Sequence, residues 1–154
     1  MHVIDARKDR ITFSAAIVVS RFNEEITSGL LVGALARFKE LEFAAEQLTV
    51  VWVPGAVEIP IMAKRLAKTK RYQAILALGA VIRGETSHYD YVCDQVSGGC
   101  QRVALDESVP VVFGVLTTEN EEQARDRIGG KHGHKGRDVV DAAVELVSAL
   151  RQVV

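Results

Sequence analysis

The segment AVIRGETSHYDYV, residues 80–92, places reactive side chains directly after a wholly apolar run. The run stops at Arg83, and Thr86 and His88 follow where a helix should begin. Free backbone N–H groups at a helix start attract anions, and an imidazole transfers protons near neutral pH. The pattern predicts a site that holds a phosphate and moves a proton. The alternative is an ordinary capped helix with a surface histidine.

A second group of candidates is cationic and surrounds the glycine-rich stretch GGKHGHKG. Its charged and imidazole side chains are those of Arg127, Lys131, His132, His134 and Lys135. Cations here suit a lid over a phosphate, although the C-terminus of a helix favours cations without any ligand. The two histidines have no clear third ligand, so we expect no metal site.

Two further segments offer groups for a planar or polyhydroxylated ligand. SRFN, residues 20–23, holds the ring of Phe22 in a polar loop, where it could stack on a heterocycle. VPGAVE, residues 53–58, ends on Glu58, which could accept hydrogen bonds from a polyol. The alternative for Glu58 is an acid in the first turn of a helix, favoured by the helix dipole.

The composition is that of an ordinary globular protein. The 154 residues are 48% hydrophobic and 25% charged, with a formal net charge of −1, which argues against a nucleic-acid partner. No apolar run approaches the roughly 20 residues that span a bilayer. Residues 1–13 carry charges where a signal peptide needs an apolar stretch, so we expect no signal peptide. We expect one cytoplasmic domain, residues 1–154, with no membrane partner. Cys93 and Cys100 read as reduced packing thiols.

Apolar runs alternate with helical patterns along the chain. The expected strands are residues 13–19, 48–53, 74–82 and 109–117. Five helices are expected, at residues 24–41, within 54–69, and at about 87–106, 119–128 and 137–151. Asn23 is the expected N-cap of the first helix, and Thr118 with Glu121 forms an expected capping box at the start of the fourth. All four strands are continuous hydrophobic runs, which indicates burial on both faces.

This order predicts an α/β protein, a three-layer αβα sandwich around a four-stranded parallel sheet, flavodoxin-like in class. Ligands of such sheets bind beyond the carboxyl ends of the strands. Residues 20–23, 53–58 and 82–88 all follow expected strands, so we expect these three segments to converge on one site.

Together, SRFN, VWVPGAVEIP, ALGAVIRGETSHYDYV, VPVVFGVLTTENEEQARDR and GGKHGHKG resemble the 6,7-dimethyl-8-ribityllumazine synthase family over residues 13–150. The resemblance implies a transferase of riboflavin biosynthesis that uses no cofactor. Its members condense 5-amino-6-(D-ribitylamino)uracil with 3,4-dihydroxy-2-butanone 4-phosphate, through an imine, loss of phosphate, ring closure and dehydration.

The resemblance also implies roles for individual residues. His88 corresponds to the proton donor and acceptor. Substrate-binding positions are Phe22, Ala56, Val57, Glu58, Ala80, Val81, Ile82 and Phe113. Phosphate-binding positions are Glu85, Thr86, Arg127 and Lys135. Phe113 and Arg127 correspond to residues that complete the site of a neighbouring subunit.

Homo-oligomers are implied as well, namely pentamers, with decamers, sixty-subunit shells and association with riboflavin synthase as further options. Three positions depart from the family pattern. Val57 stands where an aromatic is frequent, and Asp138 where Glu is frequent. His134 stands where the turn usually reads Gly-Asn-Lys-Gly, at a place that influences how pentamers associate.

Three other functions remain to be weighed. The first is a non-catalytic relative that holds a flavin or lumazine. The second is an archaeal-type riboflavin synthase, which would not need both the phosphate loop and Arg127. The third is a phosphate-binding signalling domain, which needs clustered acids at strand ends; only Glu58, Glu85 and the more distant Asp90 are available.

Overall fold

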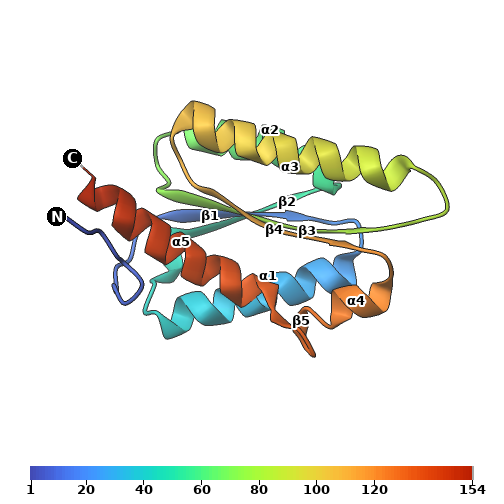
Figure 1. The fold of residues 1–154 in the computed structure, drawn as a ribbon, viewed down its shortest axis with the longest axis horizontal. Helices are drawn as coiled ribbons and strands as arrows, with labels where there is room; N and C mark the ends of the chain where they lie inside the picture. The colour runs from blue at the N-terminus through green and yellow to red at the C-terminus, as the bar shows by residue number, and fades with distance from the viewer. Residues whose placement is uncertain (154) are drawn as a thin grey trace.

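The computed structural model describes residues 1–153 and has three layers, with α2 and α3 on one side of a sheet and α1 and α5 on the other (Figure 1). The strands of the sheet are β1 (Ala15–Ser20), β2 (Leu48–Val53), β3 (Ala74–Ile82) and β4 (Val111–Thr118). The helices are α1 (Glu24–Glu40), α2 (Ile59–Lys68), α3 (His88–Glu107), α4 (Glu121–Arg125) and α5 (Lys135–Gln152). Short 3₁₀ turns, η1 (Ala45–Gln47) and η2 (Ala56–Glu58), flank β2.

The sheet is parallel throughout, in the order β2-β1-β3-β4, as the flavodoxin-like prediction requires. Its central strands are covered on both sides. In β1, Ile17 and Val19 belong to the core cluster beneath α1 and α5, whereas Ala16 and Val18 belong to the cluster beneath α2 and α3. Successive side chains of a strand point to opposite faces, so a strand covered on both faces is apolar at every position.

Strand β2 corrects the expectation that all four strands are buried on both faces. It lies at the edge of the sheet, and all its residues except Val53 are half-buried or exposed. Trp52 is half-buried, and the guanidinium of Arg21 lies 5.1 Å from its ring centroid. An edge strand has a neighbouring strand on one side only, so it is less buried than its apolar sequence predicts.

Of the two predicted helix caps, one lies at the expected residue and the other is wrong. Asn23 is the N-cap residue of α1, as predicted, and has a left-handed conformation (φ 62°). Its side chain does not cap the helix; instead its Nδ2 donates to the Ala80 carbonyl at 3.0 Å. Helix α4 is capped by Asn120, whose Oδ1 accepts from the Gln123 N–H at 2.8 Å. Thr118 cannot cap this helix because it is still the last residue of β4.

The glycine-rich stretch forms a small antiparallel hairpin of β5 (Ile128–Gly130) and β6 (Gly133–His134). Gly129 and Gly133 have positive φ angles of 102° and 78°, which glycine adopts without steric cost. The hairpin ends at His134, and helix α5 starts directly after it at Lys135, two residues earlier than the predicted start at about residue 137. His134 is its N-cap, and its Nδ1 accepts from the Gly136 N–H at 3.1 Å.

The two termini lie side by side at the end of the molecule away from the β3–α3 loop (Figure 1). The carboxylate of Asp9 accepts from the Ser148 hydroxyl at 2.6 Å and from the Gln152 amide at 3.1 Å. Cys93 and Cys100 are both free thiols, as predicted, and burial raises the pKa of Cys100 to about 11. Within residues 1–153, no helix has the length and apolarity needed to cross a membrane.

Candidate active site

A cavity of about 540 Å³ opens at the carboxyl ends of β1, β2 and β3. This is the point at which the strand order reverses between β1 and β3, where α/β sheets bind ligands. The three segments expected to converge do so here. The predicted residues that line the cavity are Phe22, Ala56, Val57, Glu58, Ala80, Val81, Ile82, Thr86 and His88.

Two apolar side chains of the cavity wall are exposed to solvent. Phe22 is 72% exposed and Val57 is 38% exposed. Two backbone bonds hold the loop of Phe22 against β2 and the turn after it: Arg21 N–H to the Val53 carbonyl at 2.8 Å, and Phe22 N–H to the Pro54 carbonyl at 3.0 Å. A solvated ring on a loop whose backbone is held in this way suits stacking on a planar ligand.

Glu58 is a polar group of the cavity wall. It ends η2, and its Oε2 is buried without a hydrogen-bond partner among the described residues. Buried polar atoms are normally paired, and a buried charged oxygen left unpaired destabilises the protein. A hydroxyl group of a bound ligand would satisfy this oxygen.

The loop of residues 84–87 and the first turn of α3 form the third wall. His88 is the first residue of this 20-residue helix, and it is exposed to solvent. The His88 N–H donates to the Thr86 hydroxyl at 3.3 Å, while the N-cap residue Ser87 makes no side-chain cap bond. A long helix with its first N–H groups beside Gly84 and Thr86 offers the positive dipole end that anions prefer.

Residues that the sequence reasoning did not select also line the cavity. They are Asn23, Pro54, Gly55, Gly84, Tyr89 and Val92. Tyr89 and Val92 are three positions apart on α3, a spacing that places them on one helix face and could have identified both. Burial raises the pKa of the Tyr89 hydroxyl, with a hydrogen bond to Cys93 as the second cause.

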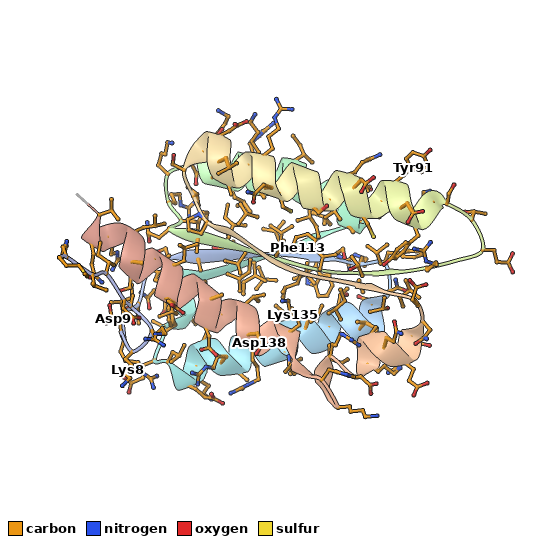
Figure 2. All side chains as sticks on the ribbon, viewed as in Figure 1. Lys8, Asp9, Tyr91, Phe113, Lys135 and Asp138 are labelled. Atoms are coloured by element: carbon orange, nitrogen blue, oxygen red, sulfur yellow. The ribbon has the colours of Figure 1, made fainter. Side chains whose placement is uncertain are left out.

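Four predicted residues lie outside the cavity wall. Glu85 is in the 84–87 loop but exposed. Phe113 packs against the core cluster beneath α2 and α3, and Lys135 starts α5 beyond the other side of the sheet (Figure 2). The Arg127 guanidinium donates to the Gln123 carbonyl at 2.7 Å, and the Lys135 N–H to the Arg127 carbonyl at 2.8 Å. Within a single chain, Arg127 and Lys135 therefore do not reach the cavity that contains His88.

Metal ligands are not gathered at this cavity or elsewhere in residues 1–153. No group of three or more His, Cys, Asp or Glu side chains in that range could hold a metal ion.

Comparison with known proteins agrees with this geometry. The family model described as 6,7-dimethyl-8-ribityllumazine synthase matches residues 12–151. The chain belongs to the lumazine synthase family. It is similar to a 6,7-dimethyl-8-ribityllumazine synthase of Coxiella burnetii strain Dugway 5J108-111, with 59% identity over 142 residues, 92% of this chain and 94% of the relative. The protein of the same name from Coxiella burnetii strain CbuG_Q212 is 58% identical over 142 residues, again 92% of this chain and 94% of the relative. The resemblance inferred from the sequence motifs is confirmed.

Proposed function

We propose that this chain condenses 5-amino-6-(D-ribitylamino)uracil with 3,4-dihydroxy-2-butanone 4-phosphate to 6,7-dimethyl-8-ribityllumazine, releasing phosphate and water, in riboflavin biosynthesis. The observation that carries the proposal is the content of one cavity. It combines a solvated aromatic ring, an unpartnered buried carboxylate oxygen and a helix N-terminus that begins with histidine. These are the groups that a heterocycle, a polyol chain and a phosphate would each require.

The uracil substrate would occupy the half of the cavity between Phe22 and the end of β3. Phe22 stacks on the pyrimidine, and the strand end at Val81 and Ile82 contacts its edge. Glu58 accepts a hydrogen bond from a ribityl hydroxyl, which would pair its buried Oε2. Ala56 and Val57 close the wall beside it; the valine offers less contact area than an aromatic side chain would.

The phosphate of the second substrate would bind at the start of α3. The positive end of the α3 dipole, with the hydroxyl of Thr86 and the loop at Glu85, would surround the group that must leave. Arg127 and Lys135 lie outside the cavity of their own chain. They would serve the phosphate in an oligomer in which Phe113 and Arg127 complete a neighbouring site.

His88 would transfer the protons of the reaction. It would accept a proton as the amine attacks the ketone and return one during dehydration to the imine. It would then assist elimination of phosphate and ring closure. General acid/base catalysis of this kind contributes about 10²–10⁴-fold. Holding two small substrates together contributes up to roughly 7–11 kcal/mol, without any cofactor.

We extend the proposal to the protein as a whole: one domain in a cytoplasmic homo-pentamer, with decamers or sixty-subunit shells as higher assemblies and riboflavin synthase as an associated protein. The His134 hairpin lies where the family pattern differs, so it is the first place to examine for altered assembly. Analytical ultracentrifugation of the purified protein measures the subunit number directly.

The test mixes the purified protein with both substrates and follows phosphate release and lumazine fluorescence above the uncatalysed rate. Equal, enzyme-dependent amounts of both products are expected. A protein that binds flavin or lumazine tightly but accelerates nothing would contradict the proposal and favour the non-catalytic relative. A preparation that consumes lumazine to form riboflavin would favour a riboflavin synthase instead.

A further inference from the structure

We infer that Arg83 is a positioning residue of this site: its guanidinium closes the 84–87 loop and holds Tyr89 and the start of α3 against the cavity. The inference rests on the proposed function. Arg83 follows the last residue of β3, and Tyr89 lies in the first turn of α3, so the two residues flank the loop on either side.

The first anchor of Arg83 joins β3 to the end of β4. Its backbone N–H donates to the Thr118 carbonyl at 2.9 Å, which continues the β3–β4 pairing by one residue. Its Nε lies 2.8 Å from Oε2 of Glu119. The guanidinium is therefore held from the side of the sheet.

The second anchor reaches across the loop to helix α3. The Arg83 Cζ lies 4.3 Å from the centroid of the Tyr89 ring, within the range of a cation–π interaction. Its Nη2 lies 3.3 Å from Oδ1 of Asp90. One planar side chain thus spans from the end of β4 to the first turn of α3, over a loop of four exposed residues.

These partners explain why Arg83 acts through its neighbours. Two carboxylates and an aromatic face already occupy the guanidinium, and Arg83 is not part of the cavity wall, whereas Tyr89 and His88 are. Only a flat guanidinium both stacks and forms a fork of hydrogen bonds; an ammonium group does one or the other. Arg83 is 38% exposed, so its ion pairs add little to global stability. The expected effect is on the geometry of the phosphate loop.

The kinetic test compares Arg83→Met and Arg83→Lys with the wild type. We expect Arg83→Met to lower kcat/KM for the butanone phosphate by about 10–100-fold, the scale of a catalytic group displaced by about 1 Å. KM for the uracil substrate should stay within about twofold, because Phe22 and Glu58 are on other loops. Arg83→Lys should recover part of the loss. Arg102→Met is the matched control, since Arg102 forms its exposed ion pair with Asp106 far along the same helix.

A double-mutant cycle tests the stack itself. If Arg83 acts through the ring, Arg83→Met combined with Tyr89→Leu should be no worse than the more damaging single variant. Tyr89→Phe keeps the ring, so Arg83→Met should still cause its full loss when it is introduced into the Tyr89→Phe background. Fully additive losses would contradict a shared role.

Amide hydrogen exchange provides a measurement that needs no turnover. Exchange of residues 84–90 should be faster in Arg83→Met than in wild type and unchanged in Arg102→Met. Equal exchange, or equal losses of affinity for both substrates, would overturn the inference. Failure of the proposed function would appear instead as an inactive wild type, while the exchange comparison would still decide the role of Arg83 in ordering the loop.

Discussion

The two faces of the sheet are packed in different ways. Beneath α1 and α5, close contact leaves no room: a Cβ added at Gly33 would overlap the imidazole of His134, and one added at Gly136 would overlap the Leu30 carbonyl oxygen. Phe38 is completely buried there, with its ring centroid 4.8 Å from that of Phe43.

The face beneath α2 and α3 opens into the cavity at its carboxyl end. That end keeps an unpaired carboxylate oxygen at Glu58, a solvated ring at Phe22 and an exposed imidazole at His88. Unpaired buried polar atoms and exposed apolar side chains do not stabilise a fold. The α2–α3 face has a close-packed core of its own, in which a Cβ added at Gly99 would overlap Pro60. The difference therefore lies at its carboxyl end, which retains groups suited to ligands.

The largest effect should fall on catalysis. His88→Ala should lower kcat by about 10²–10⁴-fold, because the proton donor and acceptor is lost. His88 is exposed, so the midpoint of thermal unfolding should barely change. Steady-state kinetics with calorimetry of the same samples checks both. Wild-type kcat in the variant would remove His88 from the mechanism.

The next effect should fall on stability, on the α1–α5 face. Phe38→Ala should lower the free energy of unfolding by about 3–5 kcal/mol, because it leaves a cavity in a core that is fully buried. Val32→Ala is the control on the same helix; Val32 is 67% exposed, and the change should stay within about 0.5 kcal/mol. Denaturant unfolding measures both. Similar losses in the two variants would mean that burial on this face does not set stability.

Two glycines compare a close contact between α1 and α5 with a solvent-exposed position on α3. Gly136→Ala should destabilise by about 1–3 kcal/mol, since the new methyl group meets the Leu30 carbonyl. Gly98→Ala on α3, where a Cβ meets nothing within 4 Å, should stabilise by about 0.4–1 kcal/mol through the unfolded chain. Opposite signs in thermal unfolding are expected; the same sign would mean that the contact with Leu30 does not decide the effect at Gly136.

The smallest effect should be a pH dependence at His134. Burial lowers the pKa of its imidazole, and nearby Arg137 lowers it further, with Asp138 acting in the opposite direction. The folded state then binds the proton less readily than the unfolded state, so stability falls as the pH drops below the unfolded pKa of about 6.5. Protonation also removes the Nδ1 acceptor that caps α5. The fall in thermal midpoint between about pH 7 and about pH 5 should be smaller in His134→Asn than in the wild type. An equal fall in both proteins would mean that another group causes the pH dependence.

Several structural features follow from sequence pattern alone. Strands β2 and β3 begin and end at the predicted residues, because each is an apolar run bounded by polar residues or turn formers. The parallel sheet follows from runs that do not alternate. The start of α3 at His88 follows from the loss of apolar pattern after Ile82. Each of these features depends on residues that are neighbours in the chain, so the sequence alone predicts it.

Other features depend on contacts between distant segments. The side chain of Asn23 bonds to the Ala80 carbonyl, 57 positions away, instead of capping its own helix. Trp52 is only half-buried because its strand lies at an edge. Arg127 stays outside the cavity of its own chain, although the sequence motifs grouped it with the phosphate loop. Composition and periodicity report which residues prefer burial, whereas only the assembled tertiary structure decides which distant groups meet.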